Sequence, residues 1–140
     1  MKHRKLALAL ALAALSSFAA AGAAAQELDW EEWADVSIIE IITVDPDGDL
    51  RDTKVWFVTI DDTAYLRTNG SRWLANIKRD PEVVIRIEGR EFPQLAHVVP
   101  GEEIIERVDA ASREKYGWQE ALIHPFRIKP PDILRLSPRG

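Results

Sequence analysis

The residues best suited to chemistry lie in one segment, 65–79, where a predicted strand runs through a polar turn into a predicted helix. Backbone N–H groups and the positive end of the helix dipole make the start of a helix a favourable place for an anion. The turn offers two hydroxyls, an amide and a glycine: Thr68, Ser71, Asn69 and Gly70. Basic side chains lie on this segment and on the preceding strand: Arg51, Lys54, Arg67 and Arg72. The pattern predicts a phosphate site, with an ordinary Ser-capped polar turn as the alternative.

Other arrangements that could do chemistry are weaker in this sequence. His97 and His124 are far apart along the chain and have no second ligand at metal-binding spacing, so we predict no metal site. Ser71 lacks the Gly-x-Ser-x-Gly context of a nucleophilic serine. No catalytic side chain is therefore predicted.

The elements that would position the 65–79 segment are short strands and shorter helices. Alternating or Ile-rich runs predict six strands, at 37–44, 50–60, 64–68, 82–88, 91–99 and 133–137. Capping and stop signals predict three helices, at 30–35, 71–79 and 102–116. We expect the first three strands to form a meander, and Pro93 predicts an edge or a bulge. Five or six mostly antiparallel strands with about three short helices suit a small barrel.

The N-terminus has the pattern of a cleavable secretory signal peptide. Basic residues at 2–5 precede an apolar run at 6–15, and small residues end at Ala25. The apolar run is shorter than the roughly 20 residues that a membrane-spanning helix needs, although an uncleaved anchor is the alternative. Cleavage after Ala25 would leave a single domain at 26–140, located in the periplasm or secreted and not embedded in a membrane.

The charge of the chain limits its partners. The predicted signal peptide holds three of the 18 basic residues and none of the 23 acidic ones, so residues 26–140 carry a net charge of −8. An acidic surface argues against nucleic acid as a partner. The chain has no cysteine, so its stability in an oxidising compartment rests on packing without disulfides.

The same polar segment resembles a known family. The stretch Tyr65–Arg72, followed by Ile77 and Asp80-Pro81, is similar to the flavin-contacting stretch of the pyridoxamine-phosphate-oxidase-like FMN-binding split barrels. This resemblance covers about 38–99. The stretches 109–117 and 133–138 look more like an uncharacterised subgroup related to deazaflavin-dependent nitroreductases, and Trp73 before Asn76-Ile77 fits that version.

The resemblance implies a split-barrel homodimer that holds FMN or a deazaflavin at the subunit interface. Arg51, Thr68, Ser71 and Arg72 would contact the cofactor phosphate, and Trp56 and Trp73 would lie beside the ring or its tail. Lys54, Arg67 and Asn69 complete the predicted site. The flavin oxidases of this family carry lysines where Trp56 and Trp73 stand.

Two functions follow from the sequence. One is an exported flavin- or deazaflavin-dependent oxidoreductase, in which the protein binds and orients the cofactor and the cofactor carries the hydride or electron chemistry. The other is a split barrel without a cofactor that serves as a periplasmic binding or interaction module. Export supports the second function, because a chain exported unfolded must find its cofactor outside the cytoplasm.

Overall fold

The computed structural model describes residues 27–117 and 129–139 of the chain. The predicted signal peptide and His124 lie outside these residues. Cleavage after Ala25, export and the single domain at 26–140 therefore stay predictions.

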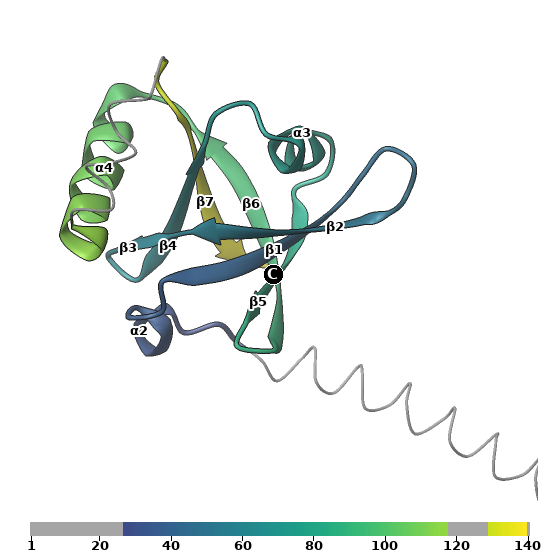
Figure 1. Cartoon of the computed structure of the whole chain (residues 1–140), viewed down its shortest axis with the longest axis horizontal. Coiled ribbons are helices and arrows are strands. Elements are labelled where there is room, and N and C mark those ends of the chain that lie inside the picture. The colour runs from purple at the N-terminus through teal and green to yellow at the C-terminus, as the bar shows by residue number, and fades with distance from the viewer. Residues whose placement is uncertain (1–26, 118–128, 140) are drawn as a thin grey trace, which may run out of the picture.

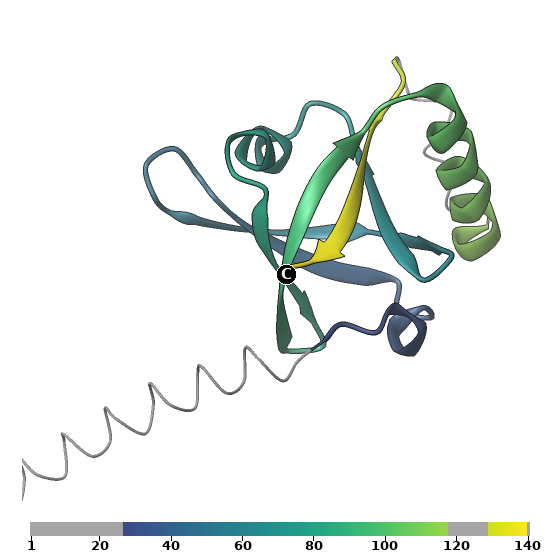
Figure 2. The same cartoon turned by 180° about the vertical axis from the view of Figure 1, so that it is seen from behind.

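The described residues form one curled antiparallel sheet with short helices around it (Figures 1 and 2). The strands are β1 (Ile38–Val44), β2 (Leu50–Trp56), β3 (Val58–Ile60), β4 (Thr63–Thr68), β5 (Glu82–Ile87), β6 (Arg90–Val99) and β7 (Asp132–Pro138). The helices are α2 (Trp30–Trp33), α3 (Arg72–Arg79) and α4 (Glu102–Tyr116). Strand order is β2-β1-β5-β6-β7-β4-β3. The predicted mainly-β barrel with short helices is confirmed.

The predicted second strand, 50–60, is divided into two, which gives seven strands in place of five or six. The chain breaks at Phe57, whose N–H and C=O are bonded to the hydroxyl of Tyr116 at 3.1 and 2.8 Å. β2 then pairs with β1, whereas β3 pairs with β4 at the other end of the strand order. The predicted pairing of 50–60 with both of its neighbours is thus confirmed, but each half of 50–60 pairs with only one of them. Because β2 runs directly into β3, the break at Phe57 connects the two ends of the curled sheet.

Pro93 lies within the sheet and not on an edge strand. β6 pairs with β5 on one side and with β7 on the other, so the predicted edge is not an edge strand but a local one at Pro93 itself. Pairing with β7 begins only at Gln94, opposite Pro138. On the β7 side, Pro93 therefore has no partner strand. A residue without a backbone N–H is tolerated at such a position.

The barrel interior is filled by alternate residues of the strands together with aromatic residues of two helices. Its least exposed members include Ile39, Ile41, Leu66, Val83, Ile85, Ile87, Phe92 and Leu134. Trp30 and Trp33 enter this core from α2, and Trp73 enters it from α3. As the sequence predicts, Ser71 caps α3, because its Oγ accepts the N–H of Leu74 at 3.3 Å.

Helix α4 packs on the outer side of the barrel against β3 and β7 (Figure 1). It has the predicted bounds and ends at Gly117, whose φ of 58° favours glycine. Its contacts form a second, smaller cluster around Val58, Val108, Tyr116 and Ile133. Among the described residues, we find no helix whose length and apolar character would let it span a membrane.

Candidate functional site

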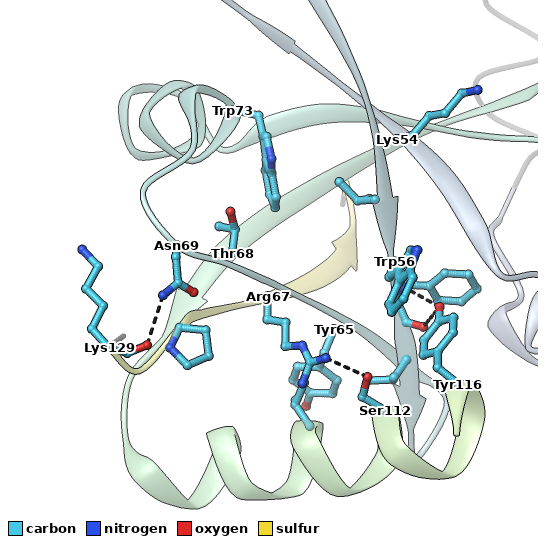
Figure 3. A pocket seen from close by; sticks show the side chains of 15 residues that line it. Lys54, Trp56, Tyr65, Arg67, Thr68, Asn69, Trp73, Ser112, Tyr116 and Lys129 are labelled. Carbon is cyan, nitrogen blue, oxygen red and sulfur yellow. Dashed lines mark hydrogen bonds between the residues drawn. The ribbon is translucent and has the colours of Figure 1, made fainter. Parts of the chain in front are cut away.

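A cavity of about 710 Å³ lies between α4 and the barrel. Its walls come from the β2–β3 break, β4, the first turn of α3, α4 and the chain before β7. Six of the nine predicted site residues line it: Lys54, Trp56, Arg67, Thr68, Asn69 and Trp73. Three do not: Arg51, Ser71 and Arg72. The fold thus gathers residues from β2, β4 and α3 around one space (Figure 3).

Aromatic side chains stand on two sides of this cavity. Trp73 is 6% exposed and is held by the barrel core. Trp56 stacks on Tyr116 with 4.5 Å between ring centroids and an interplanar angle of 15°. Figure 3 shows Trp73 and Trp56 on opposite sides of the space, with Tyr65 near α4. Such walls suit a flat ring, and the volume lies in the range typical of small-molecule and cofactor sites.

Tyr116 fixes one of these walls. Its hydroxyl lies 2.7 Å from the carbonyl oxygen of Ser37 and 2.8 Å from that of Phe57, and it accepts the N–H of Phe57 at 3.1 Å. Burial raises the pKa of the Tyr116 phenol, which keeps it protonated as a donor. Because Tyr116 is tied to the β2–β3 break, the ring of Trp56 stacks on a fixed surface.

Arg67 crosses the cavity wall from β4 to α4. Its Nη1 donates to Asp109 Oδ1 at 2.6 Å and its Nη2 to Ser112 Oγ at 2.9 Å. Both charged side chains are only 14% exposed. Figure 3 shows Arg67 extended toward α4, at the side of the cavity away from Trp73. The positive charge expected for a phosphate is thus balanced by a carboxylate of the chain itself.

Arg51 is also paired within the chain. Its Nε and Nη2 donate to the two carboxylate oxygens of Asp45 at 2.8 and 3.0 Å. This bond, followed by one from Asn76, lowers the pKa of Asp45. The buried Asn76 also donates to Thr43 Oγ1 at 2.9 Å, which ties α3 to the β1–β2 hairpin. Arg51 therefore helps hold the hairpin that α3 packs on.

The polar turn before α3 is bonded largely to itself. Thr68 Oγ1 lies 2.9 Å from Ser71 Oγ, and the side-chain amide of Asn69 donates to the carbonyl oxygen of Lys129 at 3.1 Å. Arg72 is exposed, and its charge lowers the pKa of Asp45. Contact of these residues with a phosphate stays a prediction.

Sequence reasoning missed the α4 wall of the cavity, and also Lys129 and Pro131 in the chain before β7. Val108, Ser112 and Tyr116 all line the cavity from this helix. Their spacing of four residues places them on one helix face, so the pattern was present in the sequence. A serine between Val108 and Tyr116 on this face was the only sequence signal of a polar contact there, and the structure buries it at 2% exposure.

Lys115 lies at the same end of α4. Its Nζ donates to the carbonyl oxygen of Phe57 at 3.0 Å and sits 3.4 Å from the centroid of the Phe57 ring. Burial lowers the pKa of Lys115 to about 8. The end of α4 is thus attached to the β2–β3 break through two consecutive side chains, Lys115 and Tyr116.

The histidines and carboxylates form no metal centre in the part of the chain that the structure describes. His97 is exposed on β6, away from the cavity. The predicted absence of a metal site is not tested for His124, which lies outside the described residues.

The curled sheet with a cavity against its outer helix defines a split barrel of the pyridoxamine-phosphate-oxidase-like, FMN-binding class, as the sequence motifs predict. The family model for F420H(2)-dependent quinone reductase matches residues 40–120, and the chain belongs to this family. A search of curated proteins returned no match.

Solved structures agree with this assignment at the level of the fold. A conserved hypothetical protein from Mycobacterium tuberculosis matches with a TM-score of 0.66 and 22% identity, over 81% of this chain and 82% of that one. The heme storage protein HutZ from Vibrio cholerae matches with a TM-score of 0.62 and 19% identity, over 79% and 87%. An F420-H2 dependent reductase, FDR-A, matches with a TM-score of 0.57 and 17% identity, over 73% and 95%.

Proposed function

We propose that this protein is a deazaflavin-dependent reductase that binds an F420-type cofactor in the cavity between α4 and the barrel. The observation that carries the proposal is the cavity itself, about 710 Å³ with Trp73 on one side and the Trp56–Tyr116 stack on the other. Membership of the F420H(2)-dependent quinone reductase family supports a deazaflavin as the ligand. When bound, this cofactor supplies a hydride to an oxidised acceptor such as a quinone.

The protein's own contribution is to bind the cofactor, to orient its ring and to shield that ring from water. Trp73 is held in the barrel core and Trp56 is held by its stack on Tyr116, so each presents a fixed apolar face to a flat ring. Buried aromatic faces also keep water from the ring. No described side chain needs to act as an acid or a base, because the cofactor carries the redox step.

We place the phosphate-bearing tail of the cofactor toward the rim on the side of the cavity where the exposed residues Asn69 and Lys129 line it (Figure 3). The first turn of α3 lies beside this rim, so Thr68, Ser71 and Arg72 remain the expected phosphate contacts. Replacing Arg72 with Ala should weaken a phosphate-bearing cofactor by about 1.5–3 kcal/mol. Unchanged affinity would remove Arg72 from the site.

The second candidate function is a binding or interaction module without a cofactor. The observation that favours it is the internal pairing of the two arginines that a phosphate clamp would use: Arg51 with Asp45 and Arg67 with Asp109. On this alternative the cavity would take an uncharged ligand or a segment of a partner protein.

Titration distinguishes the two functions. Protein beginning at residue 26 is titrated with F420, FMN and haem while Trp fluorescence is followed. A ring beside Trp56 and Trp73 should quench strongly, and Trp73→Phe should lose much of that quenching. Trp33→Phe is the matched control, since Trp33 packs on Phe92 away from the cavity, with 6.3 Å between ring centroids. No quenching by F420 at tens of micromolar would reject the reductase and leave the cofactor-free module.

Turnover is the second test of the reductase. Reduced F420 is mixed with a soluble quinone, and its oxidation is followed by absorbance with and without the protein. We expect faster oxidation with wild-type protein and slower oxidation with Trp73→Phe. Binding without turnover would point to cofactor storage or carriage.

We also propose export and self-association. Export rests on the charge and apolar pattern of residues 1–25; mass spectrometry of the periplasmic fraction should find a chain that begins at Gln26. Self-association is supported by large apolar side chains exposed on the strands: Ile38, Val44, Leu50 and Val98. Light scattering should give twice the monomer mass, and Leu50→Lys should reduce that mass if Leu50 lies in the interface.

A further inference from the structure

At the α4 side of the cavity, Arg67 of β4 is paired with a carboxylate of the chain itself. Arg67 donates to Asp109 at 2.6 Å and to Ser112 at 2.9 Å, both on α4. The two charged side chains are equally shielded from water, at 14% exposure each. A short, shielded arginine–carboxylate pair is a strong interaction, and a ligand anion must compete with it for the guanidinium.

We propose that Asp109 is a specificity-determining residue that prevents Arg67 from binding the phosphate of a bound cofactor. The inference rests on the proposed function for the identity of its ligand. With Asp109 ionised, a phosphate near Arg67 would face a negative charge as well as a positive one. We therefore expect the ring to lie against the α4 wall and the phosphate to lie at the rim on the side of Asn69 and Lys129, opposite Lys54 (Figure 3).

The position of Asp109 fits this role. Arg67 and Ser112 line the cavity, whereas Asp109, also on α4, is not one of the lining residues. Its carboxylate accepts from the guanidinium at 2.6 Å, so it changes the charge of the wall without lining the cavity itself. A specificity residue of this kind acts by repelling one class of ligand, in this case phosphate at the α4 wall.

Riboflavin and FMN provide the probe, because they differ only in the phosphate. We define the phosphate preference as the affinity for FMN divided by that for riboflavin, each measured by Trp quenching. Asp109→Asn should raise this preference by about tenfold, the effect of one charge-assisted hydrogen bond. The amide oxygen of asparagine can still accept from Arg67, so the arginine keeps this contact while the negative charge of Asp109 is removed.

Asp52→Asn is the matched control. Asp52 accepts from Arg86 at the same 2.6 Å distance, but on the outer face of the sheet and away from the cavity. This variant should leave the phosphate preference unchanged. An equal rise in both variants would mean that net charge, and not Asp109, sets the preference, and it would overturn the inference.

A double variant covers the case in which Asp109→Asn does not fold. Arg67→Met with Asp109→Leu removes both charges together, a change that buried pairs often tolerate. If Arg67 does not bind the phosphate in the wild type, this double variant keeps the wild-type phosphate preference. A tenfold loss would show that Arg67 binds the phosphate in the wild type, contrary to the inference.

Failure of the proposed function would leave the inference testable. If no flavin binds, inorganic phosphate is used as the probe, and the melting temperatures of wild type and Asp109→Asn are compared with and without it. We expect phosphate to stabilise Asp109→Asn more than the wild type. Equal shifts in the two proteins would reject the role of Asp109 whatever the cofactor is.

Discussion

The barrel interior and the α4 side of the barrel are built from similar apolar residues but are packed differently. In the interior, Ile41, Ile85 and Ile87 are fully buried and fill the space between the strands. On the α4 side, Ile104 and Ile105 are only partly buried, and the cavity lies beneath the same helix. The interior therefore supplies stability, and the α4 side leaves room for a ligand.

The polar contacts of the two regions differ in the same way. On the outer sheet face, Arg86 bonds to three carboxylates whose side chains are 29–54% exposed, and pairs that water reaches contribute little to stability. On the α4 side, the contacts of Arg67 and Tyr116 are shielded from water. Shielded contacts of this kind hold α4 at a defined distance from the barrel where apolar packing alone would not.

The largest effect should come from the barrel interior. Ile85→Ala removes a side chain that is 0% exposed and should lower the free energy of unfolding by about 2–5 kcal/mol. Ile105→Ala on α4 should cost only about 1 kcal/mol, because that side chain is partly buried. Urea unfolding of the two variants measures both values. Equal losses would mean that α4 is as tightly integrated as the strands.

Tyr116 tests how the α4 side is held. Tyr116→Phe keeps the ring that stacks on Trp56 but leaves the backbone groups of Ser37 and Phe57 without the hydroxyl. Unfolding free energy should fall by about 1–3 kcal/mol, and the N–H of Phe57 should exchange with solvent faster. Tyr65→Phe is the control, since Tyr65 is half-buried beside the same helix. A loss of the same size in both variants would argue against a special role for the Tyr116 hydroxyl.

The contrast between the two regions also explains what the sequence could predict. The strands of the interior carry period-two alternation, so Val83, Ile85 and Ile87 marked β5 and its buried face correctly. The Ser71 cap and the burial of Trp73 and Ile77 followed from spacing in the same way. These features depend on neighbours in the chain, which the sequence displays directly.

The α4 side depends on contacts between distant parts of the chain. The break at Phe57 is fixed by Tyr116, which lies 59 residues further on, so the alternation through 50–60 looked like one strand. The pairing of Arg67 with Asp109 spans 42 residues, and from sequence Arg67 looked available to a phosphate. Only the folded chain shows that its own carboxylates already bind these basic groups.

The smallest predicted effect concerns pH and the end of α4. Burial lowers the pKa of Lys115 to about 8 from 10.5, so below about pH 8 the lysine is charged in both states and its desolvation opposes folding. Between about pH 8 and pH 10.5, Lys115 has lost its proton in the folded protein but keeps it in the unfolded chain. The free energy of unfolding must therefore rise with pH across this range, because the unfolded state binds more protons. Because Lys115 is half-exposed, we expect a gain of only about 1 kcal/mol.

Lys115→Met supplies the reference for this measurement. Urea unfolding of both proteins from about pH 7 to about pH 10 should show the gain in the wild type and not in the variant. The raised pKa of Tyr116 acts in the opposite direction, but only above its ordinary value of 10.0, so the window below that pH isolates Lys115. A parallel pH dependence in the two proteins would mean that the end of α4 admits water freely. Lys115 would then be as solvated as a surface lysine. The last turn of α4 would resemble the outer sheet face, where charged side chains are open to water, and not the shielded contacts of Arg67.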